Sequence, residues 1–437
     1  MNAVVLAVLV MLALNMLRVN VVLALVVGAL AGGSVTHLGF SASLASFSQG
    51  VGAGANIALG YALLGAFAMG LSSSGVPAWL VGKIKKQLLR SPHKSGQNRF
   101  LLLLVIVLIA VASENLVPIH IAFIPLLIPP LLGVFADLRI DRRLVACCLT
   151  FGLTASYMLL PAGFGHVFLI EVLARNLQEN GLTIDPASMP LAMAIPVGGM
   201  LLGLLVASRS YRTTQAPEMT AVPAPTPEEP ALPLSKALGA ALATVLTVVC
   251  QIKTGSIVIG ALAGCLTLPL TGVLRLRDSN EVFIRGMKTM AWFCFVMIAA
   301  AGFAQVIRDT GAVADLVASS QGMLAHHPFV TILLMLLTGL LITMGVGSSF
   351  ATVPVLATLY VPIGMEMGLS SLAIAALVGT AGALGDAGSP ASDSTLGPTA
   401  GLNADGRHDH IRGSVLPTFL HFNVPLILFG WLAVILL

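Results

Sequence analysis

The sequence contains few charged residues for its length. Asp, Glu, Lys and Arg together make up only 9% of its 437 residues, whereas a soluble globular domain has roughly 25%. Hydrophobic residues make up 57% of the chain, and the mean hydropathy is +0.97. About ten or more apolar runs are long enough to cross the ~30 Å hydrocarbon core of a bilayer. These features exclude an ordinary soluble protein and predict an all-α polytopic membrane protein.

Other absences exclude further classes of protein. The sequence has no glycine-rich loop of the GxxxxGKS type, so ATP hydrolysis would need a separate subunit. The five cysteines lie in or beside apolar runs, a pattern that indicates no disulfide or metal framework. The net charge of +4 comes from a few short basic loops, which excludes nucleic acid as a partner. We therefore expect no enzyme activity and no bound cofactor, and we expect energy coupling to come from an ion gradient.

A polar, proline-rich segment at 209–236 divides the chain into two halves, 1–208 and 237–437. The segment 67–81 aligns with 303–317 at an offset of 236, and six of the fifteen aligned positions are identical. This similarity predicts two structural repeats joined by a cytoplasmic linker. Three further pairs align at the same offset or at one residue more: Ser113 with Ser349, Pro118 with Pro354, and Pro161 with Pro398.

Corresponding loops of the two halves differ in charge, which indicates that the repeats are inverted in the membrane. The loop 83–99 is strongly basic, whereas its counterpart near 319–335 contains only two histidines. Conversely, the loop 39–50 has no charged side chain, whereas its counterpart 275–288 has four basic and two acidic residues. Because basic loops face the cytoplasm, we expect 83–99, 136–143 and 275–288 inside, and 39–50 and 319–327 outside.

Polar interruptions within long apolar stretches predict re-entrant hairpins and broken helices. The stretch 101–134 lies between two basic loops, so the chain must return to the side from which it entered. Its centre, SENLVPIH, contains Pro118, which removes a backbone donor and disfavours a continuous helix. The stretch 329–363, centred on GSSFATVP, is the counterpart. Each predicted repeat therefore has five spans and one hairpin, giving ten spans with both termini outside, and discontinuous helices are expected at 154–163 and 385–401.

Polar side chains at these interruptions form the predicted binding site. Irregular backbone at membrane depth is tolerated only where it is buried in protein or faces a water-filled cavity. Hydroxyls, carboxylates and unwound carbonyls supply the oxygen ligands that small cations prefer. Close packing of helices is the alternative explanation for the hydroxyls. The candidate site for Na⁺, H⁺ or a substrate comprises Ser113, Glu114, Asn115, Ser348, Ser349, Thr352, Asp386, Ser392, Asp393, Ser394 and Thr395.

Three acids in this set, Glu114, Asp386 and Asp393, lie away from the loops. Ionisable residues inside a membrane are costly and usually mark ion pathways. An excess of negative charge favours a cation, Na⁺ or H⁺, as the ligand. We expect Asp393 to be the principal ion-binding carboxylate because it lies within the unwound SPASDST run, with Glu114 and Asp386 supporting it. The alternative role for Asp393 is to cap a half-helix.

Other ionisable residues give weaker indications. His120 and His166 lie near the interruptions and could titrate near neutral pH, although a structural role is the more common one for such histidines. Arg308 and Asp309 fit either a site or a structural ion pair at the membrane edge. The segment 405–410, which contains two acids and two histidines, is interpreted as an anchored cytoplasmic surface.

The stretch 385–409 reads GDAGSPASDST followed by GLNADGRHDH, and it resembles the GDxxSPxSDTT and acidic-histidine motifs of NhaC-type Na⁺/H⁺ antiporters. With ASENLVPIHIAFIPLLIPP, the whole chain resembles the bacterial Na⁺/H⁺ antiporter family of the ion transporter superfamily, which includes amino-acid (histidine) permeases. The resemblance implies inverted repeats, paired re-entrant hairpins and alternating access. Ser394 stands where the family motif has Thr. The matching positions are Asp386, Ser389, Pro390, Ser392, Asp393, Ser394 and Thr395.

Two functions follow for a multi-pass protein of the bacterial inner membrane. In the first, Asp393 and Glu114 alternately bind Na⁺ and H⁺ and exchange them. In the second, an ion gradient drives uptake of an amino acid such as histidine, whose carboxylate would meet a half-helix N-terminus and whose amine would meet an acid. An ion channel is disfavoured because inverted repeats with broken helices suit alternating access. The expected partners are Na⁺, H⁺, the lipid bilayer and, in the second case, a small amino acid; a homodimer is left open.

Overall fold

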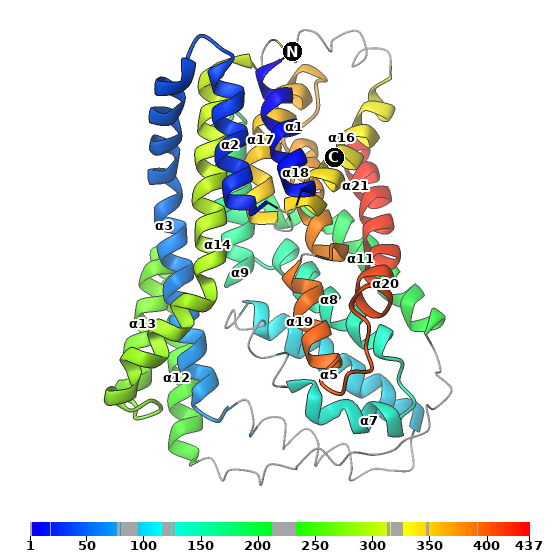
Figure 1. The fold of residues 1–437 in the computed structure, drawn as a ribbon. Helices are drawn as coiled ribbons and strands as arrows, with labels where there is room; N and C mark the ends of the chain where they lie inside the picture. Colours follow the sequence, from blue (N-terminus) through cyan, green and yellow to red (C-terminus); the bar gives the residue numbers. More distant parts are fainter. Residues whose placement is uncertain are drawn as a thin grey trace.

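In the computed structural model, the described part of the chain is almost entirely helical (Figure 1). No strand occurs among the residues that the structure describes. Six of the described helices, or seven if one bent pair counts as a span, are long and apolar enough to cross a membrane. Four other described apolar helices are shorter, with 10–17 residues, and the predicted number of ten spans stays a prediction. The described residues are 2–17, 19–76, 79, 95–115, 124, 127–211, 233–312, 315, 327–346, 349–390 and 392–437.

The helices of the first half are α1 (Ala3–Met16), α2 (Val21–Ser34), α3 (Gly39–Ser73), α5 (Ser95–Asn115), α7 (Leu132–Asp137), α8 (Arg142–Leu159), α9 (Phe164–His166), α10 (Arg175–Glu179) and α11 (Met189–Ser210). Those of the second half are α12 (Leu234–Thr254), α13 (Ile257–Leu270), α14 (Leu276–Thr310), α16 (Pro328–Val346), α17 (Ser349–Glu366), α18 (Ser371–Gly388), α19 (Asp393–Leu402), α20 (Leu416–Thr418) and α21 (Val424–Leu436). Short 3₁₀ and π-helical segments complete them: η1 (Pro129–Leu131), η2 (Val167–Ala174), η3 (Pro186–Ser188), η4 (His410–Val415) and η5 (Phe419–Asn423).

The helices pack into two bundles that lie side by side in Figure 1. Helices α1–α3 and α12–α14 form the scaffold bundle, in which the long helices α3 and α14 pack along one another. Helices α5, α8, α11 and α16–α21 form the core bundle. Every residue of α18 from Ala373 to Gly388 is buried. The many alanines and glycines of α18 allow this burial because small residues let neighbouring helices approach closely.

Helices α3 and α14 have 35 residues each and run antiparallel. A Cβ atom on Gly50 would lie 2.5 Å from the carbonyl oxygen of Ala301, and one on Gly65 would lie 2.6 Å from that of Gly286. The repeat offset of 236 relates the two pairs reciprocally: residue 50 corresponds to residue 286, and residue 301 corresponds to residue 65. Such reciprocal contacts are what a two-fold axis between inverted repeats produces. They support the predicted inversion, while the boundaries of the two repeats stay a prediction.

The loops predicted at 39–50 and 275–288 are wrong, because both segments are helical. The segment 39–50 begins α3, and 276–288 begins α14. A helix of this length extends about 52 Å, which exceeds the ~30 Å hydrocarbon core, so its ends continue into water. The charges of 275–288 therefore mark the aqueous end of a helix. The predicted loop 319–327 lies outside the described residues except for His327, and the loop 83–99 and the linker 209–236 are described only at their ends.

The second predicted hairpin, 329–363, corresponds to α16 and α17. Tyr360 Oη donates a hydrogen bond to the carbonyl oxygen of Met335 at 2.6 Å. These two residues are equally distant from the break between the helices, so α16 and α17 run antiparallel. Of the first predicted hairpin, 101–134, helix α5 covers the first arm up to Asn115, and the rest of the SENLVPIH tip lies outside the described residues.

Both predicted helix interruptions are present. Helix α8 ends at Leu159, and the chain resumes helical structure at Phe164 with a bend of 52°. Helix α18 ends at Gly388, and α19 begins at Asp393. The predicted alignment of Pro161 with Pro398 is wrong: Pro161 lies in the first break, but Pro398 lies inside α19. The second break contains Pro390, which is the proline that separates α18 from α19 because it cannot donate a backbone hydrogen bond.

Candidate functional site

The buried carboxylate of Asp386, near the end of α18, is the centre of the candidate site. Tyr157 Oη of α8 donates a hydrogen bond to Asp386 Oδ2 at 2.7 Å, and Ser349 Oγ of α17 donates to the same oxygen. The two hydroxyl oxygens are themselves 3.4 Å apart. All three side chains are at most 8% exposed. We refer to Asp386, Tyr157 and Ser349 as the Asp386 cluster, in which three separate helices meet at one carboxylate.

A second acid, Glu114, lies at the end of α5 and is 2% exposed. Glu114 is close enough to Asp386 and Tyr157 to interact electrostatically with both. Two carboxylates in one buried region repel each other, so the charged pair is stabilised by a proton or a cation. The structure thus brings together the predicted site residues Glu114, Ser349 and Asp386.

Asn115 connects the end of α5 to the broken helix α8–α9. Its Nδ2 donates to Ser156 Oγ at 2.7 Å, and its Oδ1 accepts from the backbone N–H of Gly165 at 3.3 Å. Gly163 permits this approach, since a Cβ there would lie 1.6 Å from the carbonyl oxygen of Asn115. Asn115 and Ser349, at the two hairpin tips, therefore contact consecutive residues of α8, Ser156 and Tyr157. The ends of α5 and α17 thus approach the same part of α8, while a cavity shared by the two predicted hairpins stays a prediction.

In the SPASDST segment, 389–395, side-chain hydroxyls form hydrogen bonds across the break between α18 and α19. Ser392 Oγ donates to the carbonyl oxygen of Asp386 at 3.1 Å and also accepts from the backbone N–H of Ser394 at 3.1 Å. Thr395 Oγ1 donates to the carbonyl oxygen of Ser389 at 2.6 Å. Ser392 is thus the residue whose side chain caps α19. These hydroxyls bond to the backbone, and their role as cation ligands stays a prediction.

The remaining predicted site residues have different surroundings. Asp393 is half-buried in the first turn of α19, where a negative charge is favourable. Its role as the principal ion-binding carboxylate stays a prediction. Ser113 Oγ donates to the carbonyl oxygen of Ala110 at 2.9 Å in its own helix, and Thr352 is buried in α17. Ser348 lies outside the described residues.

Aromatic rings enclose the Asp386 cluster. Phe350 packs against Phe164 with ring centroids 4.6 Å apart, and Tyr157 packs against Phe168 at 4.7 Å. Tyr61 of α3 contacts Phe164 and Phe350 at 5.4 and 5.7 Å, which brings the scaffold bundle to the site. Sequence reasoning missed Tyr61 and Tyr157. Both tyrosines lie within apolar runs, and this position could have identified them. The chain has only four tyrosines, and a buried tyrosine hydroxyl usually needs a hydrogen-bond partner.

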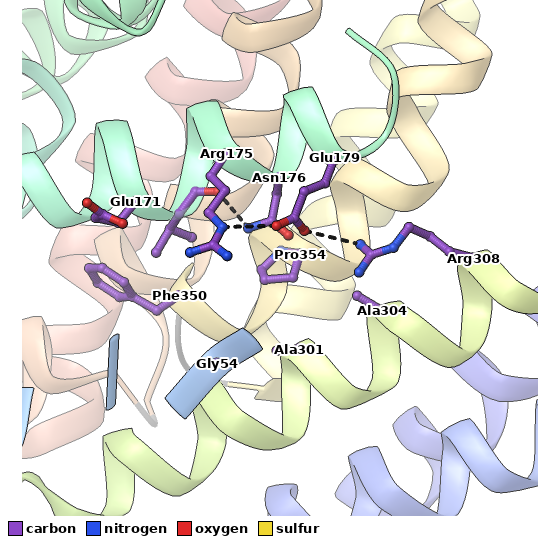
Figure 2. Close-up of a pocket in the computed structure, with 11 residues that line it drawn as sticks. Gly54, Glu171, Arg175, Asn176, Glu179, Ala301, Ala304, Arg308, Phe350 and Pro354 are labelled. Carbon is purple, nitrogen blue, oxygen red and sulfur yellow. Dashed lines mark hydrogen bonds and ion pairs between the residues drawn. The ribbon is translucent and has the colours of Figure 1, made fainter. Parts of the chain in front are cut away.

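A pocket between the two bundles lies beside Phe350 (Figure 2). The cavity itself measures about 40 Å³, and with the adjoining open solvent the free space is about 490 Å³. Sequence reasoning did not identify this pocket, because its charged residues lie on different elements. Its lining residues come from α3 (Gly54), η2 (Glu171 and Val172), α10 (Arg175, Asn176 and Glu179), α14 (Ala301, Ala304 and Arg308) and α17 (Phe350 and Pro354).

Arg308 and Asp309, which the sequence left as a site or an ion pair, have different partners. Arg308 Nη1 lies 3.6 Å from Glu179 Oε2 across the pocket. Asp309 Oδ2 accepts a hydrogen bond from Ser46 Oγ of α3 at 2.5 Å. Arg308 thus belongs to the pocket, whereas Asp309 links α14 to α3.

The segment 402–410 closes the other end of the core bundle. Arg142 makes two hydrogen bonds to Asp405, at 2.7 and 2.5 Å, and this guanidinium lowers the pKa of Asp405. His410 Nε2 lies 2.9 Å from the carbonyl oxygen of Pro390, and His408 Nε2 lies 2.9 Å from Ser414 Oγ. Burial, with a smaller contribution from Arg142, lowers the pKa of His408 to about 4. These contacts fit the predicted anchored surface.

The sequence of this chain is similar to that of a known transporter family. A model of the Na⁺/H⁺ antiporter family matches residues 148–431, and a second model, described as the Na⁺-H⁺ antiporter family, matches residues 2–88. An uncharacterized membrane protein of Vibrio parahaemolyticus is 48% identical, and the putative amino acid transporter YuiF of Bacillus subtilis is 46% identical; both alignments cover all of both chains.

Solved structures also include a similar fold. The crystal structure of the Alcanivorax borkumensis YdaH transporter, described as having an unusual topology, gives a TM-score of 0.61 with 16% sequence identity. The similarity covers 98% of this chain and 97% of that one. At this identity the likeness concerns the fold alone. Because the family model covers most of the chain and includes the Asp386 cluster, the chain belongs to the Na⁺/H⁺ antiporter family.

Proposed function

We propose that this membrane transporter is an ion-coupled secondary transporter of the bacterial inner membrane, in which Asp386 takes up and releases Na⁺ or H⁺. The observation that carries the proposal is the Asp386 carboxylate, buried beside Glu114 and held by hydroxyls from two other helices. A charge at membrane depth is costly, so such a group functions as an ion or proton site far more often than as a structural element.

The chemistry of the Asp386 cluster suits exchange of the two ions. A carboxylate with nearby hydroxyl oxygens can coordinate Na⁺, and the same carboxylate can be neutralised by a proton. The two ions would then compete for one group, so binding of one releases the other. Ser349 belongs to the hairpin α16–α17, and Asp386 lies beside the break between α18 and α19. Movement of these elements would change access to the carboxylate from the two sides of the membrane.

Ion-driven uptake of an amino acid is the second candidate function. A relative with 46% identity over the full length is named a putative amino acid transporter. The pocket beside Phe350 carries charges of both signs, which suits a zwitterion. In this case the Asp386 cluster would bind the coupling ion, and the amino acid would bind elsewhere.

The test uses the purified full-length protein in proteoliposomes that contain a pH-sensitive dye. Addition of Na⁺ should drive proton flux in the wild-type protein, and Asp386→Asn should abolish that flux. Asp393→Asn, measured in parallel, tests the prediction that Asp393 is the principal ion-binding carboxylate. Glu281→Gln serves as a control because Glu281 is exposed at the start of α14, where it pairs with Arg285. Uptake of labelled histidine under a Na⁺ gradient tests the second candidate.

Wild-type flux from a correctly folded Asp386→Asn protein would contradict the role of Asp386. Loss of flux in Asp393→Asn alone would instead make Asp393 the principal carboxylate. Histidine uptake that depends on Na⁺ and on Asp386, without Na⁺-driven proton flux, would favour the amino-acid transporter.

A further inference from the structure

The pocket in Figure 2 contains two arginines and two glutamates: Glu171, Arg175 and Glu179 lie along one face of η2 and α10, and Arg308 faces them from α14. Arg175 Nε donates to Glu179 Oε1 at 2.9 Å, and Arg308 Nη1 lies 3.6 Å from Glu179 Oε2. Two guanidinium groups therefore share one carboxylate. This end of the pocket has an excess of positive charge.

Glu171 provides the opposite charge, one helical turn before Arg175. Among the described residues Arg175 pairs with Glu179, one turn later, rather than with Glu171. The cation nearest to Glu171 is His166, with Nε2 at 3.9 Å from Oε1, and it carries charge only when protonated. The guanidinium of Arg175 lies between the two glutamates in Figure 2. The pocket thus has a negative end at Glu171 and a positive end around Glu179.

Arg308 has a hydrogen-bond donor for which the described residues provide no acceptor. Its Nη2 donates to Gln305 Oε1 at 2.7 Å, but Nη1 is buried and has no hydrogen-bond partner among the described residues. The 3.6 Å separation from Glu179 is an ion pair and exceeds the length of a hydrogen bond. A buried donor without an acceptor is unfavourable, and a ligand carboxylate would supply the missing acceptor.

The remaining wall of the pocket is apolar. Ala301 and Ala304 line it from α14, and Phe350 and Pro354 line it from α17. Such a wall accommodates an uncharged side chain and offers no partner to a charged one. The two bundles contribute opposite sides, so a ligand here would contact both of them.

We infer that this pocket binds the zwitterionic head group of an α-amino acid with an uncharged side chain. The carboxylate binds Arg308 and Arg175, the ammonium group binds Glu171, and the side chain packs against Phe350 and Pro354. Residues one helical turn apart have Cβ atoms roughly 5–6 Å apart, a spacing that matches a ligand whose ammonium and carboxylate groups are bonded to the same carbon atom. An anion alone would be repelled by Glu171, and a cation alone would be repelled by the two arginines.

This inference rests on the proposed transport function and names its substrate class. It also suggests how binding is coupled to the ion. Phe350 follows Ser349 in α17, and Ser349 Oγ bonds to Asp386. A ligand that moves Phe350 would therefore act on the hydrogen bond that holds the carboxylate.

Calorimetric titration of the purified full-length protein with L-leucine and L-histidine at about pH 8, where both side chains are uncharged, tests the inference. Leucinamide, which lacks the carboxylate, and N-acetyl-leucine, which lacks the ammonium group, should bind about tenfold or more weakly than leucine. Arg308→Gln and Glu171→Gln should weaken leucine binding by a similar factor. Arg285→Gln, an exposed arginine on the same helix that pairs with Glu281, should bind as the wild type does.

Ala304→Leu gives an independent measurement, because it fills the pocket without removing a charge. It should weaken leucine binding and lower the melting temperature modestly, because Ala304 is buried, and the titration is therefore run on protein that is still folded. Equal binding of leucine, leucinamide and N-acetyl-leucine, or no binding of leucine and histidine to the wild type, would overturn the inference. So would unchanged binding in folded Arg308→Gln and Glu171→Gln proteins. These titrations need no ion gradient, so intact leucine binding in a wild-type protein that shows no Asp386-dependent flux would refute only the proposed function.

Discussion

At the scale of single residues, the Asp386 carboxylate depends on two hydroxyl donors from different helices. Tyr157 and Ser349 both donate to Asp386 Oδ2, and both are buried. A hydrogen bond to a charged group contributes roughly 1.5–3 kcal/mol. The two donors therefore stabilise the charged carboxylate and also join α8 and α17 to α18.

Tyr157→Phe should reduce the free energy of unfolding by about 1–3 kcal/mol and weaken the dependence of proton flux on Na⁺. The phenyl ring is retained, so the change removes only the donor to Asp386. Tyr360→Phe is the matched control, because Tyr360 is also buried but donates to the carbonyl oxygen of Met335. The control should lose similar stability and keep the Na⁺ dependence of the wild type. Identical Na⁺ dependence in the two variants would count against a functional role for Tyr157.

His408 should make stability depend on pH. Its folded-state pKa is lowered to about 4, mainly by burial, whereas an unfolded histidine has a pKa of about 6.5. The neutral ring therefore contributes stability that is fully present above about pH 6.5 and is lost as the pH falls towards 4.

Melting temperatures of the wild type and His408→Gln at about pH 7.5 and about pH 5 measure this contribution. The wild type should lose more stability between these two pH values than the variant, which cannot gain a proton at this position. Parallel losses in the two proteins would show that His408 makes no pH-dependent contribution.

At the scale of helices, the break between α8 and α9 depends on a close backbone contact. Gly163 has φ of 55°, and a Cβ there would meet the carbonyl oxygen of Asn115 at 1.6 Å. Only glycine satisfies both the left-handed backbone and the contact. The end of α5 can therefore reach Ser156 only because residue 163 has no side chain.

Gly163→Ala should destabilise the protein by roughly 2–5 kcal/mol and reduce ion flux, since it combines backbone strain with a steric clash. Gly181→Ala separates these two effects. Gly181 has φ of 93°, but a Cβ there would meet no atom within 4 Å. This control should lose only about 1–2 kcal/mol and keep its flux. Thermal unfolding and the dye assay measure both properties, and equal losses of stability would exclude the clash as the cause.

At the scale of the whole molecule, the two bundles meet at the pocket and at the Asp386 cluster. Tyr61 of the scaffold bundle contacts Phe350 of the core bundle, and Phe350 also lines the pocket. The pocket and the buried acids thus lie on the same boundary. Relative movement of the bundles would change access to both sites together, as alternating access requires.

The orientation in the membrane can be tested with two exposed alanines. Ala404 lies in the segment that Arg142 and Asp405 anchor beside the basic loop 136–143, and Ala187 lies between α10 and α11. In a variant without the native cysteines, Ala187→Cys should react with an impermeant thiol reagent in intact cells. Ala404→Cys should react only after permeabilisation, because basic segments face the cytoplasm. The reverse labelling pattern would contradict the predicted topology.

Several features were predictable because they depend on local composition. The scarcity of charge predicts a helical membrane protein, since backbone groups in lipid must bond within a helix or a closed barrel. Pro161 and Pro390 interrupt helices, and Glu114 and Asp386 are acids within apolar runs, so the breaks and part of the site were visible in the sequence. The charges of 275–288 were misassigned to a loop because a charged helix end outside the bilayer has the same composition.

Only the tertiary structure decided which side chains meet. Tyr157 and Asp386 are 229 residues apart, and Glu171 and Arg308 come from different bundles, yet each pair contributes to one site. No local pattern encodes such pairs, because they result from the packing of whole helices. The sequence by itself determined that the chain is a helical membrane protein with acids at helix breaks, since the cost of burying each residue in lipid is a local property. Packing between helices decided that Asp386 has hydroxyl partners and that a charged pocket lies beside it.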